Sequence, residues 1–354
     1  GWGLDRYGRR IFFIAGVGGY AITMLSFAFI DQVWSMVLAR IFQGIASSLM
    51  WLSARAITAD TATEQGRGRS FGGIAEASSR GSIMGTFLGF VVLNARISIN
   101  GKLTHFGSWS LLFVLYGLIS LYALYLAARR LPETNPAQTQ DEDDQGAHGR
   151  SIQWSRTWML LLLVTLVTGA SAAMISPILI IFLQENLGVD IETLSWAFLP
   201  NGLVWALLPS QLGKLADRFG RKPMMLLGLG AAAVSSFVVP SLGSVITLAL
   251  LWAFQAACYA AGDPAEQALV ADLTGSHQRG RAYGLYVMCN DLGATVGPLG
   301  GAWLYQTFGA HAPFYANGAI LALCGLVLWV FLKIPAIESG AKAQGKTKGD
   351  KAIV

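Results

Sequence analysis

Three ionisable residues stand inside long apolar stretches of the sequence, where a charge is costly unless it is paired or hydrated. Glu76 and Arg80 are four positions apart, so a helix would bring them onto one face, where they can pair. Asp291 stands in a later apolar stretch. Carboxyl groups in such places can carry protons, and a nearby arginine can tune them or bind an anionic group. A structural ion pair without a chemical task is the alternative interpretation.

Two further pairs of polar residues interrupt apolar stretches. Arg40 and Gln43 are one helical turn apart, and the arginine is a second candidate for binding an anionic group. Asp263 and Glu266 lie toward the end of another stretch. Both acids fit a buried site and a membrane interface equally well, so the sequence leaves these two interpretations open.

Trp252, Gln255 and Tyr259 are spaced by three and four positions, so they would line one face of a helix. An aromatic lining with few charges suits amphipathic or drug-like solutes better than sugars or phosphates. The same spacing is also typical of the packed core of a helix bundle.

Sequence patterns of known catalytic centres are absent, including HExxH, a Walker loop, a paired-cysteine motif and a nucleophile elbow. Cys258, Cys289 and Cys324 stand in apolar runs without metal-like spacing. We therefore expect no enzyme, no catalytic residue, no metal site and no cofactor.

One charged segment occurs twice: residues 1–10 read GWGLDRYGRR and residues 213–222 read GKLADRFGRK. In each, an aspartate can cap a helix N-terminus and pair with the arginine four positions later. We expect one charge cluster in each half of the chain, formed by Asp5, Arg9 and Asp60 in the first and by Asp217, Arg221 and Asp272 in the second. The alternative is that these residues only fix the topology and a tight turn at Gly8 and Gly220.

The composition indicates which elements must position these residues. Of 354 residues, 54% are hydrophobic and only 13% are charged, against about 25% in ordinary soluble domains. So little charge excludes an ordinary soluble enzyme and a disordered chain, because neither can form from such a composition. It predicts a multi-pass membrane protein in a lipid bilayer.

Ten apolar stretches are each long enough to cross a bilayer as a helix. They cover residues 11–30, 35–58, 70–93, 108–128, 158–183, 194–212, 223–241, 244–268, 283–306 and 312–333. The alternating pattern of membrane β-barrels is absent, so we predict an all-α polytopic membrane protein.

Lysine and arginine are unevenly distributed around these stretches. Of the 25 basic residues, 21 fall in six segments: 1–10, 55–69, 129–156, 214–222, 277–281 and 333–354. The loops on the opposite side hold only Arg96 and Lys102. Because basic residues favour the cytoplasmic side, we expect the central linker and the C-terminus there. The same distribution explains the net charge of +5 without a nucleic-acid partner.

The two parts of the chain repeat each other at a fixed offset of 212 residues. This offset relates Asp5 to Asp217, Gln43 to Gln255, Asp60 to Asp272, and residues 67–69 to residues 279–281. We assign residues 1–130 to a partial first half, 131–155 to a linker, 156–336 to a six-helix second half and 337–354 to a disordered tail. Two helices precede the charged segment in the second half alone. We therefore expect twelve helices in the intact protein and no transport by residues 1–354 alone.

Glycines follow the same repeat. They recur every fourth position on one helix of each half, at Gly81, Gly85 and Gly89 and at Gly293, Gly297 and Gly301. Such stripes allow close helix packing, either static or as a sliding contact between the halves. Pro298 can kink the second of these helices, and Thr86 takes its place in the first.

Together these motifs resemble those of the major facilitator superfamily of transporters. The repeated charged segment resembles the superfamily's signature loop, residues 40–44 (RIFQG) its RxxQG motif, and residues 293–301 its glycine-proline motif. The resemblance implies ten of the twelve helices of that fold, in two pseudo-symmetric halves. It also implies a cytoplasmic gate at the charged segments, and a central cavity faced by the helices that carry Gln43 and Gln255.

The resemblance leads us to expect a monomeric secondary transporter in the cell membrane that moves a small organic solute by alternating access. We expect coupling to protons, carried by Glu76 and Asp291, and efflux of hydrophobic or drug-like compounds. An importing symporter or facilitator is the alternative, because drug–proton exchangers of the superfamily usually carry Gly-Pro where this chain has Gly85 and Thr86. A second alternative is a membrane receptor without transport.

Overall fold

The computed structural model describes residues 1–93, 96–99, 102–105, 109–134, 154–274 and 278–332. The predicted tail and most of the predicted linker lie outside these residues. The described chain forms long helices and one short hairpin, which confirms the predicted all-α membrane fold apart from the hairpin.

The first group of elements ends before the linker. It comprises α1 (Trp2–Tyr7), α2 (Arg9–Phe27), α3 (Val33–Thr61), the 3-10 turn η1 (Glu64–Gly66), α4 (Arg67–Leu93), β1 (Arg96–Ile99), β2 (Lys102–His105) and α5 (Trp109–Arg130). The two strands pair antiparallel, with Arg96 opposite His105. This hairpin was not predicted from the sequence.

The second group follows the linker. It comprises α7 (Arg156–Ile175), α8 (Leu179–Leu187), α9 (Ile191–Leu207), α10 (Pro209–Phe219), α11 (Arg221–Val238), the 3-10 turn η2 (Val239–Ser241), α12 (Val245–Asp272), α13 (Arg279–Phe308) and α14 (Ala312–Phe331).

All ten predicted stretches are helical, but two of them, 158–183 and 194–212, are each divided into two helices, α7 with α8 and α9 with α10. Within the described residues, seven helices are long and apolar enough to cross a membrane by length and composition, and there are eight if the bent pair α9–α10 counts as one span. The other two predicted spans are α4 and α13, which have 27 and 30 residues. Their glycines and charged residues lower their hydropathy, although their length is sufficient.

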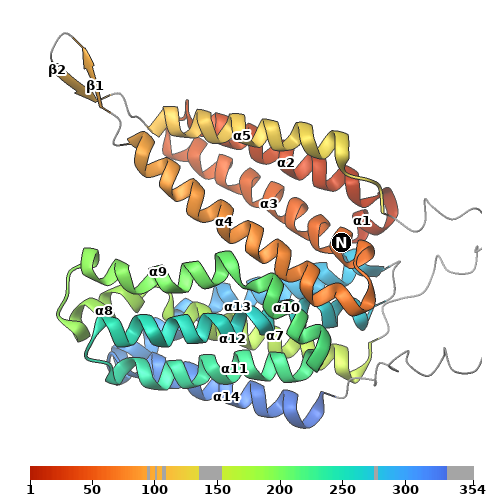
Figure 1. Cartoon of the computed structure of the whole chain (residues 1–354), viewed down its shortest axis with the longest axis vertical. Helices are drawn as coiled ribbons and strands as arrows, with labels where there is room; N and C mark the ends of the chain where they lie inside the picture. Colours follow the sequence, from red (N-terminus) through yellow and green to blue (C-terminus); the bar gives the residue numbers. More distant parts are fainter. Residues whose placement is uncertain (94–95, 100–101, 106–108, 135–153, 275–277, 333–354) are drawn as a thin grey trace, which may run out of the picture.

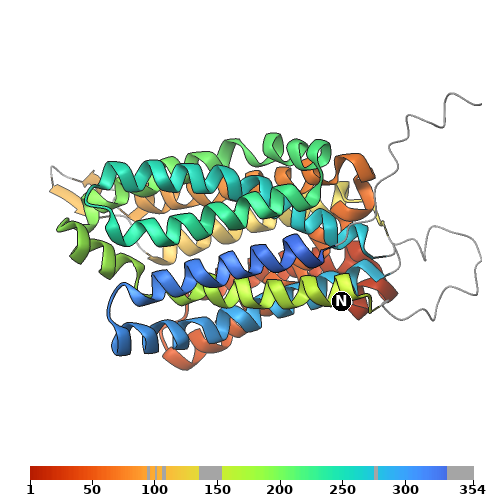
Figure 2. The same ribbon diagram turned by 90° about the horizontal axis from the view of Figure 1, so that it is seen from below.

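The sequence repeat is also a repeat of packing. In the first group α2 packs on α3 and α5, and in the second group the equivalent α11 packs on α12 and α14. Figure 1 shows α2–α5 on one side and α7–α14 on the other, with the hairpin at the end opposite α1 and α10. In the perpendicular view the long helices still run side by side (Figure 2).

The largest hydrophobic core lies where the two groups meet. It is built around buried side chains of α7, α12 and α13, including Trp158 and Tyr283, and it takes in Ala59 of α3 and Phe71 of α4. The rings of Phe71 and Tyr283 lie 6.0 Å apart. The core therefore joins the halves at the end that contains the charged segments.

The charged segments form sharp helix–helix junctions. Gly8 separates α1 from α2 with a φ of 100°, and Gly220 separates α10 from α11 with a φ of 97°. Residues with a side chain rarely adopt such angles, so both turns require glycine. The turn predicted at these two glycines is present.

Candidate functional site

The two charged segments each cap a helix of the opposite half. The Asp217 carboxylate accepts hydrogen bonds at 2.9 Å from the backbone N–H groups of Gly68 and Arg69, at the start of α4. The Asp5 carboxylate binds the two equivalent N–H groups of α13 at 2.8 and 2.9 Å. A carboxylate at a helix N-terminus meets unpaired N–H groups and the positive end of the helix dipole, so both contacts are favourable.

Glycines let the backbones come close enough for these caps. A Cβ added to Gly213 would lie 2.2 Å from the carbonyl oxygen of Gly68, and one added to Gly1 would lie 2.6 Å from that of Gly280. Any side chain there would push the helices apart, so the close approach requires the glycine that begins each charged segment.

Arginines complete the first of these clusters, which we name the α4 latch. Arg221 pairs with Asp217 and also with Asp272, at 3.3 Å between Nε and Oδ2. Arg67, at the first position of α4, pairs with the same Asp272 from the opposite half. The α4 latch therefore consists of Asp217, Arg221 and Asp272 from the second half and Arg67 from the first.

The equivalent cluster, the α13 latch, has the same plan. Arg9 pairs with Asp60 and lies 3.9 Å from Asp5, and Arg279 of α13 pairs with Asp60 from the opposite half. Burial raises the pKa of the Asp5 carboxyl, and its two backbone hydrogen bonds and Arg9 oppose that rise. Thr134 adds a hydrogen bond of 3.1 Å to Asp60.

The expected grouping of one cluster per half is thus incomplete, because each cluster contains an arginine and a helix N-terminus from the other half. Sequence reasoning overlooked Arg67 and Arg279 as members. The signal was present, since the two arginines are related by the same offset as the rest of the repeat.

Glu76 and Arg80 form the ion pair that their spacing predicts. Glu76 also accepts a hydrogen bond from the backbone N–H of Ser210 at 3.3 Å, and one from the Ser210 hydroxyl. Arg80 donates from Nε to the carbonyl oxygen of Ala206 at 2.8 Å. Both residues of α4 therefore bind the other half, at the junction of α9 and α10.

The other predicted charged positions make local contacts. Arg40 donates to the Gln43 amide oxygen at 2.8 Å, and its guanidinium lies 4.8 Å from the centre of the Phe27 ring. Asp291 is exposed and accepts a hydrogen bond of 3.2 Å from Asn290. In the described part of the chain, neither Arg40 nor Asp291 forms an ion pair.

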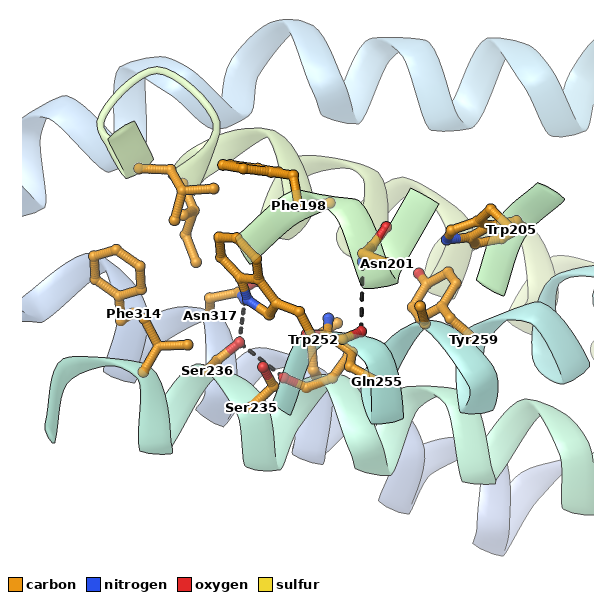
Figure 3. A pocket seen from close by; sticks show the side chains of 17 residues that line it. Phe198, Asn201, Trp205, Ser235, Ser236, Trp252, Gln255, Tyr259, Phe314 and Asn317 are labelled. Carbon is orange, nitrogen blue, oxygen red and sulfur yellow. Dashed lines mark hydrogen bonds between the residues drawn. The ribbon is translucent and has the colours of Figure 1, made fainter. Parts of the chain in front are cut away.

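A pocket of about 480 Å³ lies inside the second half (Figure 3). It contains Trp252 and Gln255, two of the predicted site residues, together with Tyr259. Other helices contribute the rest of its aromatic lining, notably Phe198 and Trp205 from α9. Sequence reasoning did not include these because they lie far from α12 in the chain.

Polar groups of the pocket are few, and three of its polar side chains are hydrogen-bonded within the protein. Asn317 donates to the Ser236 hydroxyl at 2.7 Å and is bound by Ser171. Asn201 donates to the backbone carbonyl of Trp252 at 3.4 Å. None of the described lining residues is charged, so the pocket offers stacking surfaces and a few neutral hydrogen-bonding groups.

Asp263 and Glu266, which the sequence left open, line a second and smaller pocket of about 20 Å³. Glu266 accepts a hydrogen bond of 2.9 Å from Thr165, and Asp263 accepts one of 2.8 Å from Gln267. Tyr259 lines both pockets. The acids therefore lie beside the aromatic pocket, in a space about large enough for one water molecule.

The glycine stripes have different neighbours in the two halves. Added Cβ atoms on the α13 stripe would lie 2.1–2.2 Å from carbonyl oxygens of α7, so this stripe packs directly against that helix. Added Cβ atoms on Gly81 and Gly85 would meet nothing within 4 Å in the described structure, and one on Gly89 would lie 3.0 Å from the Tyr116 hydroxyl. Pro298 lies inside α13, in the packed stripe.

One protein-family model matches nearly the whole chain, in two successive parts. The model of the Major Facilitator Superfamily matches residues 1–164 and again residues 161–353. Curated relatives include "Multidrug resistance protein MdtG" of Proteus mirabilis (strain HI4320), which is 22% identical over 341 residues that cover 94% of this chain and 82% of the relative. The protein of the same name from Salmonella typhimurium (strain LT2) is 23% identical over 343 residues, covering 94% and 81%.

Solved structures show the same fold. The human organic anion transporter MFSD10 (TETRAN) superposes with a TM-score of 0.75 at 17% identity, covering 92% of this chain and 78% of that one. The proton:xylose symporter XylE superposes with a TM-score of 0.72 at 17% identity, covering 94% and 82%.

Proposed function

The chain belongs to the Major Facilitator Superfamily, and from that membership we propose that it exports hydrophobic, drug-like compounds in exchange for protons. It is a membrane transporter of small solutes and not an enzyme. We further propose that it acts as a monomer in the cell membrane.

The aromatic pocket is the observation that carries this proposal. Trp252, Phe198 and Tyr259 supply stacking surfaces, and the centres of the Trp252 and Phe198 rings lie 4.8 Å apart. An uncharged aromatic lining favours solutes with large apolar surfaces, because binding such a solute removes few polar groups from water and adds stacking contacts with the rings. Two distant relatives of the chain bear the name of a multidrug resistance protein, which agrees with that preference.

The two latches supply the gate. Both lie at the end where basic residues concentrate, so we place that end in the cytoplasm. In this conformation the latches hold the halves together there through buried ion pairs and helix caps. Their opening would admit solute to the pocket from the cytoplasm, and their closure would commit it to the other side.

Proton coupling is assigned to Glu76 and Asp291, with Arg80 and Arg40 tuning these carboxyls or binding an anionic group. Of these two carboxyls, Glu76 is the better candidate for the proton carrier, because it contacts the opposite half directly. A change of its protonation would change an inter-half contact, which is what coupling requires.

Transport of a fluorescent lipophilic dye by the full-length protein in proteoliposomes tests the proposal. An acidic lumen should drive dye inward by exchange for protons. Trp252→Ala should weaken the apparent affinity for dye about tenfold, or about 1.4 kcal/mol. Trp329→Ala, an exposed tryptophan on α14, is the matched control and should have no effect.

Glu76→Gln and Asp291→Asn should each abolish the response to the proton gradient. Wild-type rates in both variants would refute the assignment of the proton carriers. Dye movement driven only by an alkaline lumen would instead support the importing symporter, which Thr86 in place of proline on α4 favours.

A further inference from the structure

Between α9 and α10 a membrane-spanning helix is broken. Their axes differ by 61°, and Pro209 begins the second segment. In a continuous helix a proline ring would clash with the preceding turn, and proline has no N–H to donate. Backbone bonding continues up to Leu208, whose N–H donates to Val204 at 2.9 Å, and resumes with Gln211 donating to Leu208 at 3.0 Å. The bend is therefore confined to one turn.

The bend breaks the regular backbone pairing: Pro209 has no N–H to donate, Gln211 donates to Leu208 in place of residue 207, and the Ser210 N–H binds a side chain. In an uninterrupted α-helix the N–H of residue 210 would donate to the carbonyl of residue 206. Here Ala206 accepts from Arg80 at 2.8 Å instead, and the Ser210 N–H donates to Glu76 at 3.3 Å. Arg80 and Glu76 are themselves paired. The two side chains of α4 thus take the place of the missing hydrogen bond between residues 210 and 206, one at each end.

The signs of the two charges match the two helix ends. Arg80 binds a carbonyl at the end of α9, where the helix dipole is negative, and Glu76 binds an N–H at the start of α10, where it is positive. The reverse arrangement would place an arginine against N–H donors and a carboxylate against a carbonyl acceptor. The polarity of the ion pair is therefore specific to this break.

The contact depends on docking of the two halves. A Cβ added to Gly72 of α4 would lie 2.2 Å from the carbonyl oxygen of Pro209, so the α4 backbone rests directly on the break. Gly68, Gly72, Glu76 and Arg80 follow one another at intervals of four and share this face. The ion pair reaches the break only while α4 lies against α10.

We propose that Glu76 and Arg80 are positioning residues that act as a splint: they hold the α9–α10 span bent while the halves are docked. When α4 moves away, the Ser210 N–H pairs with the Ala206 carbonyl, and the bend decreases to the smaller kink that Pro209 imposes by itself. Separation of the halves and the shape of this helix are thereby one coupled change. The inference rests on the proposed function only for the statement that the halves separate at this face.

Spin labels on Trp196 and Leu215, which are exposed positions on α9 and α10, measure the bend. The native Cys258, Cys289 and Cys324 are replaced by alanine in this experiment. A rise of 1.5 Å per residue gives a label distance about 4 Å longer in the straight helix than in the bent one. Distances are recorded in nanodiscs without solute or proton gradient, so a failure of the proposed transport leaves this test unaffected.

Glu76→Leu and Arg80→Leu should each shift the distance distribution toward the longer value, and the double variant should shift it no further. Glu192→Gln, an exposed acid in the first turn of α9, is the control and should retain the wild-type distribution. Unchanged distances in both single variants would overturn the splint.

The charge-swapped variant E76R/R80E separates the splint from an ordinary ion pair. It preserves a pair at the same spacing but reverses its polarity at the break. The splint predicts the longer distance for this variant, with an unchanged monodisperse elution profile as the check on folding. Restoration of the short distance by the swap would overturn the proposal, because a pair that merely neutralises itself is indifferent to its direction.

Discussion

The helices α4 and α13 hold equivalent places in the two halves, and their N-termini match, since an aspartate of the opposite half caps each of them. Two turns further along they diverge. Glu76 and Arg80 of α4 bind the other half, whereas Met288 and Leu292 at the equivalent positions of α13 are apolar, with 50% and 52% of their surface exposed. Closure at the latches is therefore a property of the repeat, and the deeper charged contact is made by one half only.

The glycine stripes differ in the same direction. The α13 stripe is closed against α7 within its own half, while Gly81 and Gly85 of α4 have open space in front of them in the described residues. The helix that makes the asymmetric contact across the halves is thus also the one less restrained by its own half. Of the two equivalent helices, α13 therefore has the closer backbone contacts within its own half.

Removing one arginine from each latch tests how equal the two latches are. Asp60 has 8% of its side chain exposed and Asp272 has 21%. Arg279→Ala leaves the more buried carboxylate with one partner fewer, and should lower the free energy of unfolding by about 3 kcal/mol. Arg67→Ala should cost less. Chemical unfolding in detergent micelles measures both, with the exposed Arg218→Ala as the control.

Equal losses in the two variants would show that exposure of the carboxylate does not decide the strength of a latch. A loss in the Arg218→Ala control as large as in either latch variant would mean that general charge, and not the latch geometry, is being measured.

Matched glycine substitutions test the second difference. Gly293→Ala places a Cβ 2.1 Å from the Leu166 carbonyl oxygen, and should lower the free energy of unfolding by about 2 kcal/mol through overpacking. Gly81→Ala meets open space, and should leave it unchanged or raise it by up to about 1 kcal/mol through helix propensity. Thermal unfolding of the 354-residue chain measures both. A loss of similar size in the two variants would contradict the open face of α4.

Much of the fold could be predicted because it depends on properties of single segments. A bilayer requires about 20 apolar residues per helix, so the ten stretches were visible directly. Breaks inside a span were harder to predict: residues 194–212 were predicted as one helix, and Pro209 was the local sign that α9 ends and α10 begins.

The candidate site was predictable only in part, because its contacts join segments that are far apart in the chain. The ion pair of Glu76 and Arg80 followed from their spacing, but its partners at Ala206 and Ser210 include backbone groups, which carry no residue signature. The spacing along α12 predicted that Trp252 lines the aromatic pocket. It could not predict Phe198 of α9, since no spacing rule relates residues on two different helices.

The mildest substitution, Arg80→Lys, tests the contact that only α4 makes. Arginine uses one nitrogen for the Ala206 carbonyl and another for Glu76, whereas lysine presents a single nitrogen. The variant keeps the charge and should lose about 1 kcal/mol of unfolding free energy, near the value of one hydrogen bond. Leu292→Met, at the equivalent position of α13, is the control and should change little because it conserves volume. A full retention of stability by Arg80→Lys would mean that one of the two arginine contacts contributes nothing, and the asymmetry between α4 and α13 would then rest on the carboxylate of Glu76 alone.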